Sequence, residues 1–246
     1  MIHRAHDYAH LIRRWRAVAR RAGMKLEPFA AAGEFEIFAL ISDDGDGLYV
    51  SAGIHGDEPA STEGLVAWAE KHAAKLARFP LAIFPCLNPW GLTQNTRMNE
   101  AGLDLNRAFD RDDEPVTRAL RERLRGRRFP IALTLHEDYD AQGIYLYEGL
   151  RKDAAWGGSL LRAASRIIAI DPRPRIEVSR PKSGVIRRHF DARRYARLGG
   201  LPEAVFLHRG HARRTITFET PSEFALDRRV AAQVAVIEAC VARVGG

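Results

Sequence analysis

The sequence has little with which to form disulfides and no segment that could cross a bilayer. Only two cysteines occur in 246 residues, Cys86 and Cys240, and no motif pairs them. Because disulfide-stabilised folds need a denser set of cysteines, we expect two buried free thiols in a reducing compartment. No apolar run reaches the roughly 18 residues that a transmembrane helix requires, so we expect no membrane partner.

The N-terminus lacks the apolar stretch of a secretory signal. Residues 1–25 are instead rich in arginine, and Leu11, Trp15 and Val18 recur at the spacing of one helix face. We therefore predict a basic amphipathic helix over about residues 5–22 that packs on the rest of the protein. Without a targeting signal, the expected location is the cytoplasm.

Negative charge is in deficit, since 38 Lys and Arg face 31 Asp and Glu and leave a net charge of +7. The excess concentrates between Asp171 and Arg214, where twelve basic residues face four acidic ones. Nucleic-acid binding, attraction of an acidic small substrate and simple solvation of the arginines are alternative interpretations. No nucleic-acid motif or aromatic interleaving accompanies the charge, so we expect no nucleic-acid partner.

Apolar runs alternate with segments of helical period, which predicts an α/β fold. The length and the lack of any linker or internal repeat predict one domain over residues 1–246. Strands are expected at 35–42, 48–54, 81–87, 131–135, 143–147, 204–207 and 215–218. Helices are expected at 5–22, 59–79, 115–125, 153–169 and 222–244, and residues 88–115 form a long polar segment of the kind that is usually functional.

Polar residues follow four of these apolar runs at the point where each strand is expected to end. The residues at these places are His55, the loop from Asn88 onward, His136 and Glu219. In open α/β sheets, ligands bind beyond the carboxyl ends of strands. We therefore expect the four strand ends to converge on one pocket.

Residues 53–58, Gly-Ile-His-Gly-Asp-Glu, form the sharpest local pattern. His55 and Glu58, three residues apart around a loop-to-helix corner, can face one ion, and a distant second histidine would complete a His₂Glu set with an open position for water. Mixed nitrogen and oxygen ligands suit zinc better than calcium or magnesium. The alternative is that His55 is a hydrogen-bonded turn residue and that Glu58 is a carboxylate favoured at a helix N-terminus.

Five motifs follow one another in order along the chain. They are Gly-x-His55-Gly-Asp-Glu58, Asn88-Pro89-x-Gly91, Asn95-Thr96-Arg97-x-Asn99-x-x-Gly102-x-Asp104-Leu105-Asn106-Arg107-x-Phe109, Leu135-His136 and Thr217-Phe218-Glu219. Together they resemble the zinc carboxypeptidase family over about residues 35–240. The resemblance is strongest to its small bacterial branch, which includes murein-peptide amidases and is close to succinylglutamate desuccinylases and aspartoacylases. It implies a single domain with a mixed, mostly parallel eight-stranded sheet flanked by helices.

The resemblance also implies a zinc metallohydrolase. One zinc ion would be held by His55, Glu58 and His136. The expected reaction is hydrolysis of an amide bond next to a free carboxylate in a small peptide or peptide-like substrate. An N-acyl amino acid deacylase of the aspartoacylase or succinylglutamate desuccinylase type is the alternative. A non-catalytic binding protein on the same scaffold is a third hypothesis, which nothing in the sequence favours because every expected catalytic position is filled.

Four further residues have roles that the resemblance implies. Glu219 would be the general base that activates water. Arg97 would polarise the scissile carbonyl and stabilise the oxyanion. Asn106 and Arg107 would bind the substrate carboxylate, which matches the two-pronged geometry of a guanidinium.

Structural alternatives stay open at several of these positions. Arg107 could be an ion-pair partner of Asp104 or Asp110, and Glu219 could cap the turn that follows it. Glu137 and Asp138 directly follow His136. Either could be a rival metal ligand or a carboxylate that supports the ligands. The mobile tyrosine of the family's carboxypeptidases could be Tyr145, Tyr147 or Tyr195. A second metal or a pocket wall is conceivable at His208 and His211, although a surface cluster is the simpler interpretation.

Overall fold

The strands of the protein form one eight-stranded sheet in the order β1-β2-β4-β3-β5-β8-β6-β7. The structure is a computed structural model that describes residues 4–42, 46–150, 155–188, 195 and 199–244. The strands are β1 (Leu26–Ala32), β2 (Phe35–Ile41), β3 (Leu48–Ser51), β4 (Leu81–Phe84), β5 (Phe129–Asp138), β6 (Tyr145–Leu150), β7 (Val185–Arg188) and β8 (Ala212–Pro221). The helices are α1 (Tyr8–Ala22), α2 (Pro59–His72), α3 (Pro89–Gln94), α4 (Pro115–Arg123), α5 (Gly157–Ala164), α7 (Glu203–Gly210) and α8 (Leu226–Val244), with 3-10 helices η1 (Ala73–Arg78) and η2 (Leu105–Arg107).

Parallel pairing dominates the centre of the sheet. β3 is parallel to β4 and β5, β5 is parallel to β8, and β6 is parallel to β7. The other three pairings, β1–β2, β2–β4 and β6–β8, are antiparallel. The predicted single α/β domain with a mixed, mostly parallel eight-stranded sheet is therefore confirmed.

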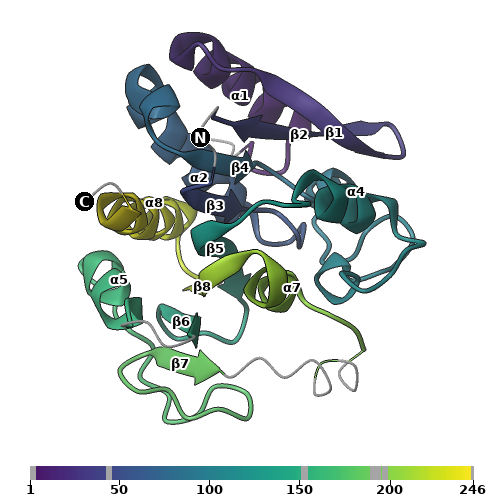
Figure 1. The fold of residues 1–246 in the computed structure, drawn as a ribbon. Coiled ribbons are helices and arrows are strands. Elements are labelled where there is room, and N and C mark those ends of the chain that lie inside the picture. Colours follow the sequence, from purple (N-terminus) through teal and green to yellow (C-terminus); the bar gives the residue numbers. More distant parts are fainter. Residues whose placement is uncertain (1–3, 43–45, 151–154, 189–194, 196–198, 245–246) are drawn as a thin grey trace.

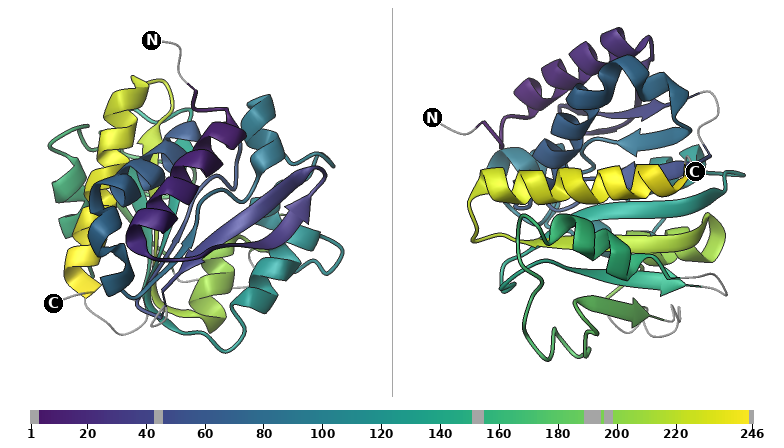
Figure 2. Two further views of the ribbon diagram at one scale, coloured as in Figure 1. Left: turned by 90° about the horizontal axis from the view of Figure 1, so that it is seen from above. Right: turned by 90° about the vertical axis from the view of Figure 1, so that its left-hand side faces the viewer.

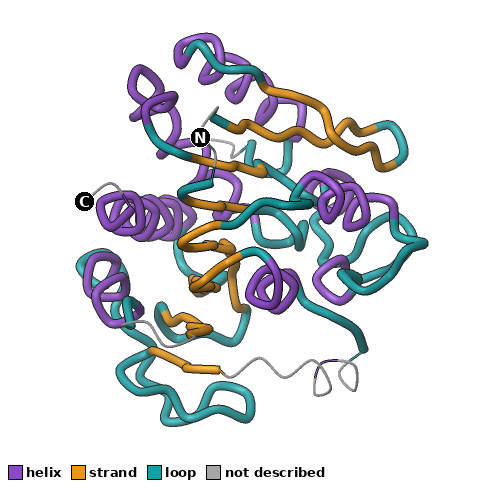
Figure 3. The backbone as a smooth tube through the Cα atoms, viewed as in Figure 1, coloured by secondary structure: helices purple, strands orange, loops and turns teal. Residues whose placement is uncertain are grey.

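Helices cover both faces of this sheet. Figure 1 shows α5 and α8 on one side of the strands and α4 and α7 on the other, and the views of Figure 2 show α1 and α2 on the same side as α8. The backbone tube of Figure 3 shows the same layers by element type. Since successive strand residues point to opposite faces, Leu48 and Val50 of β3 join the core beneath α2 and α8, whereas Tyr49 joins the core of α4 and α7.

The N-terminal helix forms as its sequence predicts. Asp7 caps it by accepting a hydrogen bond from the His10 backbone N–H at 2.7 Å, and Gly23 ends it in the left-handed conformation at φ 67°. Trp15 is fully buried, and Arg14 binds both Glu63 and Glu70. The helix therefore packs on α2, while the domain boundaries stay a prediction.

Two predictions about small segments are corrected. Residues 204–207 were expected to form a strand, but they lie in α7. A run of four apolar residues fits either element, and here Val205 and Leu207 are both buried residues of a helix, in the core that includes Phe129. No strand was expected at β1, which contains several alanines, is partly exposed and lies at the edge of the sheet.

Several element ends also differ from those expected. β3 and β4 end at Ser51 and Phe84, three residues early, whereas β5 and β8 continue through His136 and Glu219. Residues 153 and 154 of the expected helix 153–169 lie outside the described residues, and α5 covers a shorter range. The expected loop 88–115 contains α3 and η2.

The two cysteines, Cys86 and Cys240, are buried free thiols, as predicted. Among the described residues, no helix is both long enough and apolar enough to span a membrane.

Candidate active site

A cleft of about 1220 Å³ lies over one face of the sheet. The even-numbered residues of β5 and the odd-numbered residues of β8 point to this face. Its walls come from the start of α2, the segment between α3 and η2, strands β5 to β8 and the start of α7. All seven residues singled out from the sequence line this one cleft: His55, Glu58, Arg97, Asn106, Arg107, His136 and Glu219. The expected convergence on a single pocket is therefore observed.

The turn that carries His55 depends on two glycines. Gly53 adopts the left-handed region at φ 61°, which residues with a Cβ avoid. Gly56 lies so close to α3 that an added Cβ would stand 1.9 Å from the carbonyl carbon of Gly91. The chain then enters α2 with Pro59 in its first turn, which leaves Glu58 at the helix N-terminus.

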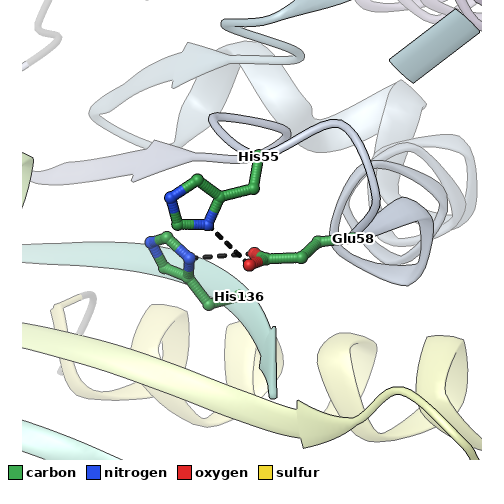
Figure 4. A group of neighbouring side chains, drawn as sticks. All are labelled: His55, Glu58 and His136. Atoms are coloured by element: carbon green, nitrogen blue, oxygen red, sulfur yellow. Dashed lines mark hydrogen bonds and ion pairs between the residues drawn. The ribbon is translucent and has the colours of Figure 1, made fainter. Parts of the chain in front are cut away.

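Three of these cleft-lining side chains, His55, Glu58 and His136, point toward one another, as Figure 4 shows. The two oxygens of Glu58 each contact one imidazole, His55 Nδ1 at 2.5 Å and His136 Nδ1 at 2.9 Å. One ligand atom of each residue lies within 4.8 Å of the others, and all three residues are buried. The cluster is the only one of this kind among the described residues.

Asp104 fixes the tautomer of His55. Its Oδ1 lies 3.2 Å from His55 Nε2, so the ring proton on that nitrogen is donated to the carboxylate. A cation bound in place of the second ring proton would leave that proton on Nε2 and meet the lone pair of Nδ1. Two acceptors 2.5 Å apart repel each other unless a proton or a cation lies between them. The geometry therefore suits a cation held jointly by these atoms.

The pKa shifts of the clustered residues also favour a bound cation. Burial alone lowers the pKa of His55, but the Glu58 carboxylate and the Asp104 hydrogen bond outweigh burial and raise that pKa to about 9. Burial likewise opposes ionisation of Glu58, yet the two histidines hold its pKa far below the usual range. For His136, as for His55, the Glu58 carboxylate outweighs burial and raises the pKa. The cluster is a buried site that attracts positive charge.

Arg97 is fixed beside the cluster by the same aspartate. Its Nε and Nη2 donate to Asp104 Oδ2 at 3.2 and 3.1 Å, and its Nη1 lies 3.2 Å from His55 Nδ1. With 39% of its side chain exposed, the guanidinium faces both the cluster and the open cleft. It can therefore donate to an oxygen that develops charge at the metal-ligand cluster.

Asn106 and Arg107 form the next part of the wall. The Asn106 Oδ1 accepts from the Glu203 backbone N–H at 2.9 Å, which leaves its amide N–H groups as donors for a ligand. Arg107 Nη1 donates to the Asn106 carbonyl at 2.8 Å. Among the described residues, no carboxylate forms an ion pair with Arg107, so the structural pairing with Asp104 or Asp110 does not occur.

Glu219 lies directly beside His136 in the sheet register and is 8% exposed. Burial raises its pKa well above the usual range, and the nearby His136 offsets part of that rise. A carboxyl with a raised pKa in an open cleft is suited to proton transfer near neutral pH.

The rival carboxylates after His136 are engaged elsewhere. Glu137 points to the opposite face of the sheet, where both its oxygens accept from Arg229 Nη1 at 2.7 and 2.8 Å. Asp138 accepts from the Tyr145 hydroxyl at 2.9 Å and from Arg173 Nη2 at 3.2 Å. Neither carboxylate joins the metal-ligand cluster.

The structure also shows where the candidate tyrosines and the two late histidines lie. Tyr145, Tyr147 and Tyr195 all line the cleft, and the Tyr145 hydroxyl donates to Asp138. The two late histidines lie away from the cluster: His208 Nδ1 is 3.5 Å from the Thr215 hydroxyl, and His211 stacks on Phe206 with ring centroids 4.6 Å apart. A second metal at that place has no geometric support among the described residues.

Sequence reasoning missed two residues that position the site. Asp104 was quoted in the third motif but given a role only as a possible partner of Arg107, yet it orients both His55 and Arg97. Its position two residues before Asn106 was the available signal. Glu203 is 1% exposed, accepts from the Tyr49 hydroxyl at 2.5 Å and orients Asn106 through its backbone. No sequence signal marks it, because its partners lie far away in the chain.

Comparison with family models finds one match within the chain. Residues 44–140 match the model of the succinylglutamate desuccinylase/aspartoacylase catalytic domain, a region that contains six of the seven predicted site residues. No curated protein matches the chain.

Solved structures match nearly the whole chain. A candidate metallopeptidase from Shewanella amazonensis SB2B is 26% identical, with a TM-score of 0.85 over 98% of this chain and 94% of that one. A second from Shewanella denitrificans OS217 is 24% identical, with a TM-score of 0.85 over 97% and 91%. A metallo-carboxypeptidase from Burkholderia cenocepacia shares the fold at 17% identity, with a TM-score of 0.66 over 95% and 68%.

These matches confirm the resemblance to the zinc carboxypeptidase family and its succinylglutamate desuccinylase relatives. The class of protein that they support is a zinc metallohydrolase.

Proposed function

We propose that the protein is a zinc-dependent carboxypeptidase or amidase that hydrolyses an amide bond next to a free carboxylate in a small peptide-like substrate. The single observation that carries the proposal is the buried cluster of His55, Glu58 and His136 in the cleft, with Glu219 beside it. Two imidazole nitrogens and a carboxylate oxygen are a donor set that catalytic zinc takes. The fixed tautomer of His55 supports this ligand set.

Bound zinc would supply Lewis-acid activation of water and of the scissile carbonyl. In the proposal, Glu219 accepts the proton of the attacking water and passes it to the leaving amine. Arg97 donates to the oxygen that becomes negatively charged, because its guanidinium is already fixed by Asp104. Asn106 and Arg107 bind the substrate carboxylate and so set which amide bond reaches the cluster.

The second candidate is an N-acyl amino acid deacylase. The observation that favours it is the match of residues 44–140 to the succinylglutamate desuccinylase/aspartoacylase catalytic domain. The same side chains would act in the same roles, with the carboxylate on the amino acid product. The two candidates differ only in what stands on the acyl side of the amide bond.

The test combines metal content with a substrate panel. We expect about one zinc per chain by elemental analysis in the wild type, little in His55→Ala, and the wild-type amount in His208→Ala, whose histidine lies on α7 outside the cluster. A peptidase releases C-terminal residues from short peptides, whereas a deacylase acts on acetyl- or succinyl-amino acids alone. Failure to bind zinc, or zinc binding without hydrolysis of either substrate class, would contradict the proposal.

A further inference from the structure

Residues 105–110, which include the proposed carboxylate-binding pair, pack against residues 200–203 at the start of α7. The Phe109 backbone N–H donates to the Leu201 carbonyl at 3.1 Å. In return, the Leu201 N–H donates to Asp110 Oδ1 at 3.3 Å. Two segments that are distant in the sequence therefore form one wall of the cleft.

Gly200 brings the two segments into direct contact at Arg107. Its φ is 133°, in the region that residues with a Cβ rarely adopt, and an added Cβ would stand 1.9 Å from the Arg107 carbonyl oxygen. The neighbouring Gly199 also has a positive φ, of 89°, but an added Cβ there would meet no heavy atom within 4 Å. The close approach to the backbone of Arg107 is thus specific to Gly200.

The orientation of the Asn106 amide depends on the first turn of α7. Pro202 precedes this helix and supplies no side-chain cap, so the Glu203 N–H has no acceptor within the helix. Asn106 Oδ1 accepts this N–H at 2.9 Å, which assigns the amide oxygen to the helix and turns the amino group away from it. A shift of α7 would break this bond and free the Asn106 side chain to rotate.

The start of α7 is anchored by a buried hydrogen bond to β3. Glu203 is buried, and its Oε1 accepts from the Tyr49 hydroxyl at 2.5 Å. The Tyr49 ring is also buried, with the ring centroids of Phe84 and Phe129 at 5.1 and 5.6 Å. A ring packed in this way has little freedom, so its hydroxyl fixes the position of Glu203 relative to β3. From β3 the chain runs into the turn that carries His55.

We propose that Tyr49 and Glu203 are positioning residues. Their hydrogen bond fixes the start of α7 on β3, and this holds Asn106 and Arg107 at a set distance from the metal-ligand cluster. The inference rests on the proposed function and deepens it, because that distance decides which amide bond reaches the cluster. Tyr49 and Glu203 are not among the residues that line the cleft, so they act on a substrate through the pair that they position.

The test compares each substrate that has a free carboxylate with its carboxamide. Hydrolysis of Ala-Ala is compared with Ala-Ala-NH2, and of N-acetylalanine with N-acetylalaninamide, so that either proposed activity can be measured. The wild type should favour the acid by about tenfold in kcat/KM, since only the acid offers a carboxylate to Asn106 and Arg107. Tyr49→Phe removes one hydroxyl and should reduce this ratio to within about threefold of one, mainly through KM. Its zinc content should stay at the wild-type level.

Tyr8→Phe is the matched control for the loss of a buried hydroxyl. Tyr8 on α1 is also buried, its hydroxyl donates to the Glu36 carbonyl, and it is not among the residues that line the cleft. Its removal should destabilise the fold by a similar amount and leave the acid-to-amide ratio unchanged.

Glu203→Gln separates geometry from charge. Burial raises the pKa of Glu203, and the hydrogen bond from Tyr49 offsets part of that rise, so the bond does not depend on an ionised carboxyl. Glutamine still offers an oxygen to the Tyr49 hydroxyl, and the variant should keep most of the preference for the acid. A loss as large as that in Tyr49→Phe would assign the effect to charge and overturn the inference.

Two glycine variants test the contact at Arg107. Gly200→Ala should lose the preference for the acid, because its methyl group displaces the Arg107 backbone. Gly199→Ala introduces a Cβ at a positive φ without that contact and should keep the preference. An unaltered ratio in folded Tyr49→Phe, or equal losses in the two glycine variants, would overturn the inference.

Hydrogen exchange of the protein as purified separates the inference from the proposed function. In Tyr49→Phe, the N–H groups of Leu201 and Glu203 should exchange about tenfold faster, because their acceptors lie on the facing segment. The N–H groups of Leu87 and Asn88, which bond to the chain after β3, should exchange at wild-type rates. Such a change in a protein that hydrolyses none of the four substrates would contradict the proposed function and keep the positioning role. Hydrolysis of the acids with an unaltered ratio and unaltered exchange in the variant would do the reverse.

Discussion

The two ends of the cleft are built from different kinds of contact. At the metal-ligand cluster, the side chains of His55, Glu58 and His136 are nearly inaccessible and contact one another at 2.5–2.9 Å. At the β7 end, Arg188 contacts the Tyr147 ring, the exposed carboxylate of Glu177, the Ser179 hydroxyl and Tyr195. Several buried partners fix a geometry that the chemistry needs, whereas a few exchangeable partners suit recognition of a variable substrate.

The difference follows from position in the sheet. The cluster lies at the central parallel strands β3 and β5, where helices cover the sheet and little side-chain movement is possible. Arg188 lies on β7, the last strand in the order. We therefore expect substitutions at the central end to affect turnover or metal binding, and substitutions at the edge to affect substrate choice.

The largest effect is expected for Glu219→Gln. The amide is nearly the same shape as the carboxylate but cannot accept the proton of water, so kcat should fall by about 10³-fold. Zinc content should stay at the wild-type level, because Glu219 is not one of the clustered ligands. Steady-state kinetics and elemental analysis on the same samples test this, and substantial turnover by the variant would remove Glu219 from its proposed role.

Asp104→Asn should weaken zinc binding by about 10- to 100-fold, since the variant no longer accepts the His55 ring proton as a carboxylate and no longer pairs with Arg97. Competition with a chelator measures the affinity. Glu137→Gln is the control, because Glu137 follows a ligand in sequence but faces Arg229 on the other side of the sheet. Equal losses of zinc affinity in Asp104→Asn and Glu137→Gln would mean that general destabilisation of the fold weakens zinc binding.

Arg107→Lys should raise KM about tenfold and change kcat little. Lysine keeps the charge but loses the planar pair of donors that matches a carboxylate. The measurement is a saturation curve with one substrate of the active class. A fall in kcat at unchanged KM would instead place Arg107 at the reacting bond.

The smallest effect is expected for Asp171→Asn, about 1 kcal/mol in the free energy of unfolding at pH 7. Burial opposes ionisation of Asp171, but Arg173 and two backbone N–H groups hold its pKa below the usual range. The charged form is thus favoured in the folded state. The stability that Asp171 contributes is present above about pH 4 and is lost as the pH falls through the lower folded pKa.

Urea unfolding at pH 7 and pH 3 therefore tests the contribution of Asp171 directly. The difference in the free energy of unfolding between wild type and Asp171→Asn should become smaller at pH 3. Asp113→Asn, at an exposed ion pair with Arg111, should change stability little at either pH. A gap that widens at low pH would contradict the direction of the pKa shift.

The site was more predictable from the sequence than the elements around it. The motifs around His55 and Asp104 are local, so their spacing alone brings paired ligands and neighbouring cations together. The strands β3 and β4 were recognised because both faces are buried and their runs are continuously apolar. Residues 204–207 were assigned wrongly because four apolar residues do not reveal their period.

The sequence by itself determined the α/β class, the helix that Asp7 and Gly23 delimit, and the ligand candidates, because propensity, capping and motif spacing act within a few residues. Only the tertiary structure decided that Asp104 serves His55, that Glu137 turns away from the cluster, and that Arg188 shares a cleft with Glu219. The physical reason is that strand register fixes which face a side chain occupies and which distant strand lies beside it. Partners chosen by register leave no trace in local sequence.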